Sequence, residues 1–341
     1  MTENATKTLF HPFENGTLPV PGAKERALFL GAVAGFRLPD GFAADLRAVQ
    51  EFRLDFLALE RRGVAVTPEP LGDGYDLSLV LLGRHRGQNE ARIAEAYART
   101  KNGGLVLVAG GKKDGVDSLR KRLGKLIALD GSLSKHHGIA FWFTRAEAAA
   151  PVMAELALSG RAVMVDGRFR AAPGMFSHDR IDPASRLLAE HLPEKLAGRA
   201  ADFGAGWGYL GAALLERAGQ ALSGLDLYEA DHAALEAAKI NLAAHAGRLP
   251  LGFHWRDLLS EPVPRQYDVV VMNPPFHHGR AAEPAIGTGM IRAASAALKP
   301  GGRLFLVANR GLPYEAELAA MFAASGETLR DERFKLLWAR R

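Results

Sequence analysis

Short hydrophobic runs alternate along the chain with longer segments in which apolar residues recur every three or four positions. The runs 75–81 and 267–272 are nearly all apolar, which predicts strands buried on both faces. The segments 89–99 and 285–298 that follow them have helical periodicity. Strands that alternate with helices are typical of α/β proteins with parallel sheets.

This order of elements occurs twice. In each half, a strand that begins Tyr-Asp is followed by a helix, a Gly-Gly turn, a further strand and a second helix. The turns lie at 102–104 and 299–302, and the strands after them at 105–109 and 303–308. A tandem duplication explains this order most simply. We therefore predict two Rossmann-like domains, at residues 1–150 and 151–341.

The second half carries a candidate ligand site that the first half lacks. Residues 200–211 predict a short strand, a glycine turn and a helix start, and glycines let a ligand approach the backbone closely. In the first half, residues 29–35 are only partly similar to this turn, and no acidic residue precedes their first glycine. We expect the N-terminal domain to be a degenerate copy without the ligand.

Asn273, Pro274, Pro275 and Phe276 follow the predicted strand 267–272. Two prolines cannot continue a β-ladder, so they predict a rigid turn at the carboxyl end of the strand, where open α/β sheets bind ligands. The Asn amide and the Asn and Pro carbonyls are acceptors suited to an amino group on a flat ring, and Phe276 can stack on that ring. An ordinary proline-rich turn is the alternative. In the first half, residues 83–86 stand where we expect the equivalent segment.

Three acids complete the candidate cofactor site. Asp202 precedes a turn made of Phe203, Gly204, Ala205 and Gly206. The next predicted strand covers 221–227, and Glu229 lies two residues after it. Glu229 is suited to bind ribose hydroxyls, and Asp226 is the alternative. Asp257, with Leu258 beside it, follows the strand 251–255 and is suited to an adenine amino group or to capping a helix.

The acid at the start of the glycine turn discriminates between two kinds of cofactor that contain adenosine. A dinucleotide would place its pyrophosphate over this turn, where Asp202 would repel it. S-adenosylmethionine presents an ammonium group and a sulfonium instead of a phosphate. We therefore expect S-adenosylmethionine as the cofactor.

The net charge of +5 comes entirely from the first half: residues 1–170 hold 24 Lys and Arg against 19 Asp and Glu, and residues 171–341 hold 19 of each. Basic residues are dense between 99 and 125, which indicates either a solvated helix face or a phosphate-binding patch. The candidate residues for binding the phosphates of a nucleic acid are Arg84, Arg86, Lys112, Lys113, Arg120, Lys121 and Arg122.

Composition restricts the remaining possibilities. The chain has 341 residues, 48% of them hydrophobic, and no apolar run is long enough to span a bilayer. There are no cysteines, which excludes disulfides and thiolate metal sites, and we expect no metal. The N-terminus lacks the pattern of a signal peptide, so we expect a cytoplasmic protein. We expect no membrane partner. We also expect a monomer.

In their order and spacing, the segment 202–206, Glu229, Asp257 and the segment 273–276 resemble the class I methyltransferases that act on exocyclic amino groups. The segments 173–177, 273–279, 306–314 and 333–335 are similar to the bacterial ribosomal RNA guanine-N2 methyltransferases of the small-subunit methyltransferase C type. This resemblance extends over about residues 173–337 and is weak over 1–150.

The resemblance implies two methyltransferase-like domains, the first without cofactor, and methylation of guanine N2 in ribosomal RNA, with 16S rRNA favoured over 23S rRNA. It also implies that the segment 176–182 closes over the cofactor; a helix start at Asp182-Pro183 explains that segment equally well. DNA adenine-N6 and protein glutamine-N5 methyltransferases use a similar Asn-Pro-Pro element, and a non-enzymatic RNA-binding assembly factor is a further alternative. The ribosomal RNA or the ribosomal subunit is the expected partner.

Overall fold

The structure, a computed structural model, describes residues 2–275, 277–278, 281–282 and 284–341. The chain divides into two compact units, which we call unit 1 (1–162 and 172–174) and unit 2 (163–171 and 175–341). The boundary predicted after residue 150 coincides with the first residue of helix α5, Ala150–Leu158. It stays a prediction for the limits of the functional domains.

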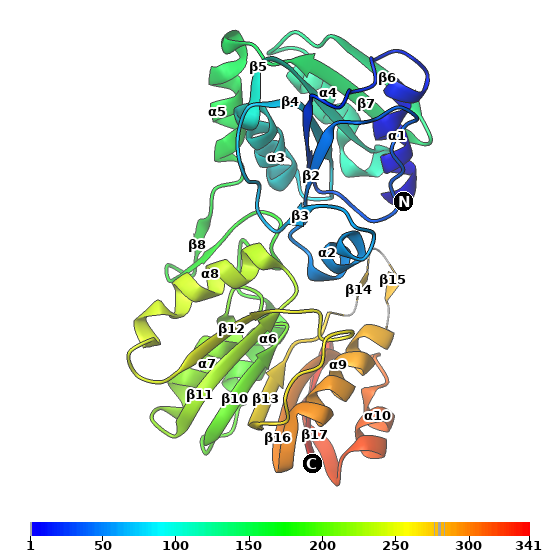
Figure 1. Cartoon of the computed structure of the whole chain (residues 1–341). Helices are drawn as coiled ribbons and strands as arrows, with labels where there is room; N and C mark the ends of the chain where they lie inside the picture. The colour runs from blue at the N-terminus through cyan, green and yellow to red at the C-terminus, as the bar shows by residue number, and fades with distance from the viewer. Residues whose placement is uncertain (1, 276, 279–280, 283) are drawn as a thin grey trace. The chain divides into compact units, whose positions relative to one another are not determined.

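Unit 1 contains a seven-stranded sheet with helices packed on it (Figure 1). Its strands are β1 (Arg26–Leu30), β2 (Asp45–Val49), β3 (Val66–Thr67), β4 (Tyr75–Leu81), β5 (Thr100–Gly111), β6 (Gly131–Lys135) and β7 (Gly138–Thr144). Its α-helices are α1 (Thr2–Glu14), α2 (Arg53–Glu60), α3 (Arg86–Arg99), α4 (Val116–Leu123) and α5, and its 3₁₀ turns are η1 (Lys112–Asp114) and η2 (Glu147–Ala149).

Unit 2 repeats this plan. Its main strands are β10 (Gly198–Phe203), β11 (Leu222–Glu229), β12 (Leu251–Trp255), β13 (Tyr267–Met272), β16 (Leu298–Asn309), β17 (Ala324–Arg330) and β18 (Phe334–Arg340). Short strands β8 (Val163–Val165) and β9 (Phe169–Ala171) pair with each other, as do β14 (His277–His278) and β15 (Ala281–Ala282). The helices are α6 (Pro183–Glu190), α7 (Tyr209–Ala218), α8 (His232–Leu242), α9 (Pro284–Ala297) and α10 (Tyr314–Met321), with the 3₁₀ turn η3 (Ala243–His245).

The two sheets have the same topology. Their strand orders are β3-β2-β1-β4-β5-β7-β6 and β12-β11-β10-β13-β16-β18-β17, which is 3-2-1-4-5-7-6 in each unit. The first five strands of each unit pair in parallel, and the strand second from the other edge is antiparallel. The predicted fold of two tandem Rossmann-like domains is confirmed.

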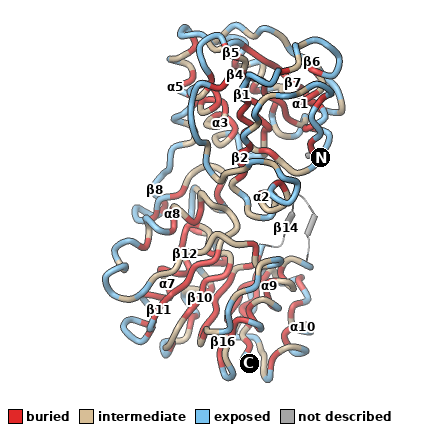
Figure 2. Tube along the Cα trace, in the orientation of Figure 1, coloured by how far each residue is buried: buried red, intermediate tan, exposed pale blue. Residues whose placement is uncertain are grey.

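The central strands of each sheet are largely buried (Figure 2). Because successive side chains of a strand point to opposite faces, apolar side chains lie on both faces of each sheet. In unit 1, Leu28 and Leu30 of β1 contribute to the core under α3, α4 and α5, whereas Ala27 and Phe29 contribute to the core under α1. A sheet covered on both faces explains why its strands read as continuous apolar runs in the sequence.

The amino-terminal edges of the two sheets contain the same ion-pair arrangement. Asp268 Oδ2 accepts hydrogen bonds from the Arg199 backbone nitrogen at 2.8 Å and from Lys299 Nζ at 2.8 Å. In unit 1, Asp76 accepts from the Arg26 backbone nitrogen at 2.7 Å and pairs with Lys101. These residues occupy equivalent positions in the two registers, so the repeat of the fold extends to side-chain contacts.

The register also aligns the carboxyl ends of the strands. Leu30 pairs with Val80 and Phe203 with Met272, so Leu81 in unit 1 is equivalent to Asn273 in unit 2. The expectation that residues 83–86 stand where Asn273 to Phe276 stand is therefore wrong by two positions, because the equivalent segment is 81–84. It begins with two buried leucines, so unit 1 lacks the amide.

Candidate active site

The glycine turn after β10 is held by backbone hydrogen bonds to the neighbouring strand. The backbone nitrogens of Gly204 and Ala205 donate to the Tyr228 carbonyl at 2.9 and 3.0 Å. Gly204 and Gly206 have φ angles of +73° and +54°, which favour glycine. The turn thus leads from the carboxyl end of β10 into α7, as the sequence predicts, and presents its backbone at the ligand-binding edge.

Glu229, at the end of β11, binds this turn directly. Its Oε2 accepts from the Gly206 backbone nitrogen at 2.7 Å, and its Oε1 accepts from the Ala230 and Asp231 nitrogens, both at 2.8 Å. Burial raises the pKa of this carboxyl, and the three backbone donors oppose the rise. Two carboxylate oxygens offer about four acceptor positions, so a ribose hydroxyl can still be accepted. Ribose binding by Glu229 stays a prediction.

Asp226, the alternative ribose ligand, has a structural role. It is buried and accepts from Arg199 Nε at 2.8 Å and from Tyr267 Oη at 2.7 Å, with His254 Nε2 at 3.3 Å. Burial acts to raise its pKa, but the hydrogen bonds from His254, Tyr267 and Arg199 outweigh it and lower the pKa below its ordinary value. These partners tie β11 to β10, β13 and β12.

Asp202 is fully buried in β10, and both of its carboxyl oxygens lack a hydrogen-bond partner within the part of the chain that the structure describes. Burial raises its pKa to about 7. A buried polar group without a partner is costly, and cofactor binding by Asp202 stays a prediction. In unit 1 the register places Phe29 at the equivalent position.

Asp257 caps the turn after β12. Its Oδ1 accepts from the Leu259 nitrogen at 3.1 Å, and its Oδ2 accepts from Ser260 Oγ at 2.6 Å. Leu258 is partly buried against the apolar core of unit 2. The segment between β12 and β13 contains this turn and no helix, so the alternative that Asp257 caps a helix is wrong. Recognition of adenine by Asp257 stays a prediction.

Asn273 follows the last residue of β13, as the sequence predicts. Its Nδ2 donates to Asp182 Oδ2 at 3.0 Å and to Ser185 Oγ at 2.9 Å. Because a carboxylate only accepts, Asp182 fixes which end of the amide faces α6, and Oδ1 takes part in neither of these two contacts. Its role as the acceptor for a ligand stays a prediction. Pro274 is buried and Pro275 exposed, and Phe276 lies outside the described residues.

Ser185 is not found by the sequence analysis, which names Asp182 only as a helix start or as the end of a segment over the cofactor, not as a partner of Asn273. Asp182 is the N-cap of α6, where its side chain also accepts from the Ser185 backbone nitrogen at 2.9 Å. The Asp-Pro pair predicted this helix start, and the alternative of a lid over the cofactor is not needed to explain it. The contact with Asn273 joins residues 91 positions apart, which no local pattern encodes.

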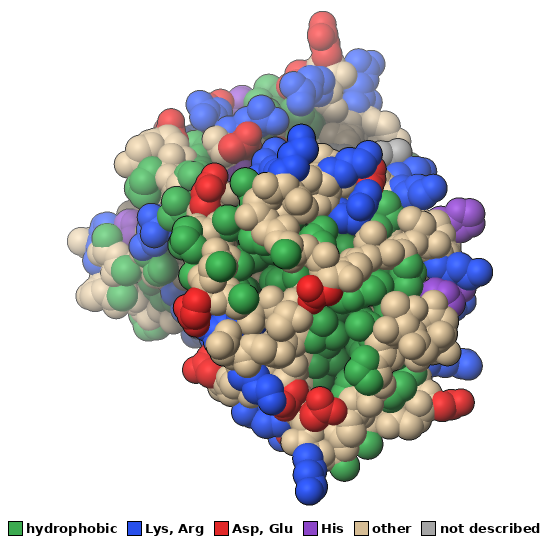
Figure 3. Space-filling view, turned by 90° about the horizontal axis from the view of Figure 1, so that it is seen from above, with side chains coloured by type: hydrophobic (Ala, Val, Ile, Leu, Met, Phe, Trp, Pro, Cys, Tyr) green, Lys and Arg blue, Asp and Glu red, His purple; other side chains and the backbone are tan. Residues whose placement is uncertain are grey.

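The predicted RNA-binding residues lie at several places in unit 1. Four of them, Arg84, Arg86, Lys113 and Arg122, line one cavity. Arg120 and Lys121 form ion pairs with Asp117 instead, and Lys112 is exposed in η1. On the face shown in Figure 3, basic side chains lie among acidic and apolar ones and do not form one continuous surface. RNA binding by these residues stays a prediction.

Two general properties complete the description. Among the residues that the structure describes, no group of three His, Asp or Glu side chains is arranged to hold a metal ion. Within the same residues, no helix has both the length and the apolar composition needed to cross a membrane.

The strand order, the glycine turn, the acid that follows the second strand and the Asn-Pro-Pro element define unit 2 as a class I methyltransferase domain. The chain belongs to the methyltransferase small domain family, whose model matches residues 166–338.

Several relatives show how far the similarity extends. The ribosomal RNA small subunit methyltransferase C of Pseudomonas aeruginosa (strain LESB58) is 32% identical over 285 residues, which cover 81% of this chain and 82% of the relative. The protein of the same name from Shewanella halifaxensis (strain HAW-EB4) is 27% identical over 274 residues, 78% of each chain.

A solved structure matches both units. It is a T. thermophilus 16S rRNA N2 methyltransferase in complex with AdoMet and guanosine, with a TM-score of 0.77 and 27% sequence identity over 97% of this chain and 91% of that one. The similarity therefore includes unit 1, where the sequence resemblance was weak.

Proposed function

We propose that this methyltransferase transfers a methyl group from S-adenosylmethionine to the exocyclic N2 amino group of a guanine in ribosomal RNA, most directly 16S rRNA. The P. aeruginosa relative is named a ribosomal RNA small subunit methyltransferase, and the T. thermophilus structure is named a 16S rRNA N2 methyltransferase in complex with AdoMet and guanosine. The proposal places the enzyme in the cytoplasm, where ribosomal RNA is found. One unit carries all the candidate catalytic residues, so a monomer suffices.

The observation that carries the proposal is the orientation of Asn273. Both hydrogens of its amide are used by Asp182 and Ser185, so Oδ1 is the atom left to accept from an incoming amino group. The adjacent Pro274 carbonyl can accept the second N–H. Two acceptors at the end of a buried strand fit an –NH2 group on a planar ring better than a hydroxyl or a carboxylate.

The residues present fit S-adenosylmethionine. Asp202 provides a buried carboxyl without partners at the glycine turn, which suits the ammonium of the methionine moiety. Glu229 keeps acceptor capacity for a ribose hydroxyl beside the three backbone donors that it already binds. When bound, S-adenosylmethionine supplies a methyl group activated by a sulfonium.

The reaction requires help because the guanine N2 lone pair is delocalised into the ring. The Asn273 and Pro274 oxygens stabilise the positive charge that develops on nitrogen as the nitrogen–carbon bond forms and the sulfur–carbon bond breaks. They also aim the nitrogen for in-line displacement, which is an orientation effect. The nitrogen becomes acidic only once methylated, so its proton can leave to water. A paired guanine must be flipped out to reach these acceptors.

A radiolabelled methyl-transfer assay tests the proposal. Purified chain and labelled S-adenosylmethionine are incubated in parallel with naked 16S rRNA, small subunits, 23S rRNA, DNA and a release factor. Label in 16S rRNA or small subunits, recovered as N2-methylguanine after digestion, supports the proposal. Label in DNA or in the release factor, or in no substrate, contradicts it.

A further inference from the structure

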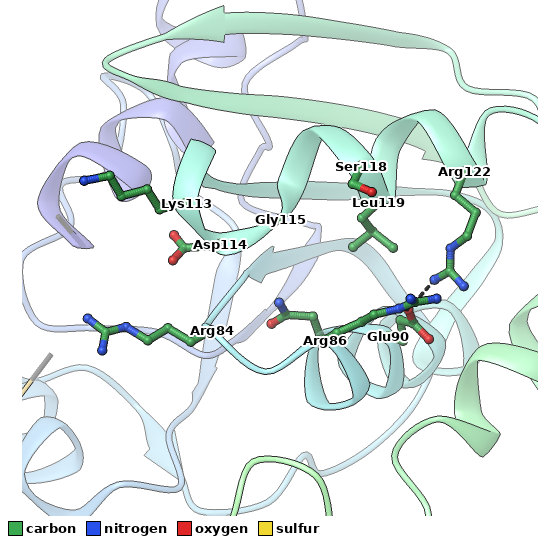
Figure 4. Close-up of a pocket in the computed structure, with 10 residues that line it drawn as sticks. Arg84, Arg86, Glu90, Lys113, Asp114, Gly115, Ser118, Leu119 and Arg122 are labelled. Carbon is green, nitrogen blue, oxygen red and sulfur yellow. Dashed lines mark hydrogen bonds and ion pairs between the residues drawn. The ribbon is translucent and has the colours of Figure 1, made fainter. Parts of the chain in front are cut away.

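Unit 1 contains a cavity of about 280 Å³ at the carboxyl ends of its parallel strands (Figure 4). Its lining comes from the loop after β4 and the start of α3, and from the loop after β5 and the start of α4. Because β4 and β5 are equivalent to β13 and β16, this cavity is the counterpart of the acceptor side of the active site in unit 2.

The cofactor side of the same unit is filled by protein. Gly31 and Ala32 donate to the Val49 carbonyl just as the glycine turn donates to Tyr228, so the backbone turn persists. The register then places Gln50 at the position of Glu229, and Gln50 Nε2 donates to the Ala32 carbonyl at 2.6 Å. The Arg92 guanidinium lies 3.0 Å from where a Gly31 Cβ would be, and pairs with Glu51 at 3.1 Å.

Divergence has therefore affected the two halves of the ancestral site differently. The half that would hold an adenosine is occupied by Gln50 and Arg92. The half that would hold an acceptor base is open and lined with four cationic side chains and two carboxylates. The volume of this cavity is slightly below that of typical pockets for drug-sized ligands, which suits a small group. The cations in its lining favour an anion.

Two of the cations are free to bind a ligand. Arg84 and Lys113 are exposed, and neither has an ion-pair or hydrogen-bond partner for its side chain among the residues that the structure describes. They come from the two different loops, and Figure 4 shows both extended toward the same side of the cavity.

The other two cations are neutralised in part. Arg86 Nε donates to Glu90 at 2.6 Å, and Arg122 also binds this buried carboxylate. The second acid, Asp114, accepts from the Gly111 backbone nitrogen at 2.9 Å and so closes its own turn. The four cations outnumber the two carboxylates, so the lining of the cavity carries a net positive charge even with both acids ionised.

The loop that carries Arg84 is held in place. Asn89 is buried in α3, and its amide both donates to the Gly83 carbonyl and accepts from the Gly83 nitrogen, each at 2.8 Å. This pair of hydrogen bonds fixes the backbone next to Arg84 and reduces the entropy lost when a ligand orders the side chain.

We propose that this cavity binds a backbone phosphate of the substrate ribosomal RNA, contacted by Arg84 and Lys113. The inference rests on the proposed function for the identity of the RNA. Unit 1 would thus bind the RNA at the position that is equivalent to the proposed binding position of the target base in unit 2. Contacts to phosphate position an RNA without reading its sequence.

The test compares two double variants for binding to naked 16S rRNA and to assembled small subunits at several salt concentrations, without S-adenosylmethionine. Arg84→Gln with Lys113→Gln removes the two free charges. Lys24→Gln with Lys125→Gln is the matched control, since both lysines are exposed and lie before β1 and after α4, at the opposite edge of the sheet. Thermal unfolding of each variant confirms that the fold is retained.

We expect the cavity variant to lose affinity for the RNA by on the order of tenfold. The slope of log affinity against log salt concentration should become shallower by about 0.9 per lost contact. The control variant should keep the affinity and the slope of the wild type. Equal values for cavity variant and wild type would overturn the inference. So would a loss seen only with assembled subunits, because the partner would then be a ribosomal protein. Failure of the proposed function can be distinguished from failure of this inference, because the first is measured as methyl transfer and the second as RNA binding without S-adenosylmethionine.

Discussion

Asn273 Nδ2 lies 3.0 Å from Asp182 Oδ2, and through this contact the N-cap of α6 orients the amide at the end of β13. Asp182 thus serves two structural purposes with one carboxylate, since it caps a helix and positions the proposed acceptor. Without the carboxylate, the Asn273 amide could rotate and present its nitrogen to an incoming amino group.

Replacement of Asp182 by serine separates these purposes. Serine is a good N-cap residue but is too short to keep the contact with Asn273. We expect Asp182→Ser to retain stability and to lower kcat by about ten- to a hundredfold, with a smaller effect on cofactor affinity. Steady-state kinetics with ribosomal RNA, at saturating cofactor, measures this.

The control for that variant is Asp231→Ala, which removes the N-cap of α8 but leaves Asn273 untouched. It should cost about 1 kcal/mol of stability and preserve kcat. If Asp182→Ser kept the wild-type kcat, the carboxylate would have a purely structural role.

Removal of the amide itself should affect the chemical step alone. Asn273→Ala is expected to reduce methyl transfer by about a hundred- to a thousandfold, because a group that stabilises developing charge is lost. Calorimetry should give an affinity for S-adenosylmethionine close to that of the wild type. A collapse of cofactor binding would instead identify Asn273 as a cofactor ligand.

The buried Asp202 predicts a pH-dependent cofactor affinity. Its pKa of about 7 means that the carboxyl is neutral at lower pH and cannot pair with an ammonium. Affinity for S-adenosylmethionine should therefore rise as the pH increases toward about 7, by at most about tenfold per unit, and then level off. Calorimetric titrations across this range would show it, and Asp202→Asn should bind weakly at every pH.

The same carboxyl affects the stability of the free protein with the opposite sign. Its folded-state pKa is raised above the ordinary value of 3.8, so the folded state holds the proton more tightly than the unfolded state. Its contribution to the free energy of unfolding is complete below about pH 4 and is lost as the pH rises toward about 7. Compared with wild type, Asp202→Asn should become relatively more stable over this interval, which denaturant titrations can detect.

Cofactor stoichiometry tests the degeneracy of unit 1. Because Gln50 and Arg92 fill the position of the cofactor, calorimetry should give one molecule of S-adenosylmethionine bound per chain. Glu229→Ala should eliminate that binding. Two sites, or one site that survives in Glu229→Ala, would show that unit 1 retains a cofactor pocket.

Gly287 in α9 provides a test of packing. A Cβ at this position would lie 1.8 Å from Tyr314 Oη, and Tyr314 is fully buried. Gly287→Ala should lower the free energy of unfolding by about 1–3 kcal/mol, because the ring has no room to move. Gly247→Ala meets no atom within 4 Å and should change stability by less than about 0.5 kcal/mol. Urea titrations compare the two.

Much of the fold is readable from the sequence because its strands are buried on both faces. The runs 75–81 and 267–272 become strands with those bounds, since nearly continuous apolar residues admit few other structures. Helix α3 begins at Arg86 rather than Asn89, because its polar first turn lacks an apolar periodicity. Pairing register has no such local signal, which is why the equivalent of Asn273 in unit 1 was misplaced by two residues.

The candidate site was predictable only where its residues follow strands. The carboxyl ends of parallel strands meet at one edge, so the glycine turn, Glu229 and Asn273 could be grouped from their order alone. Asp182 could not, because it reaches Asn273 from a helix that precedes the first strand of the sheet. The equivalence of Gln50 and Glu229 was equally hidden, since it depends on which residues of two parallel strands pair.

The repeated Asp–Lys arrangement at the amino-terminal edges has an evolutionary consequence. Asp76 and Asp268 anchor their sheets at the edge opposite the ligand sites. Substitutions at the carboxyl ends of the strands therefore leave these anchors intact. One copy of the fold can lose its catalytic residues and keep the contacts that stabilise its sheet. The spatial separation of structural support from the ligand site allows a copy of this fold to lose its catalytic residues and still fold.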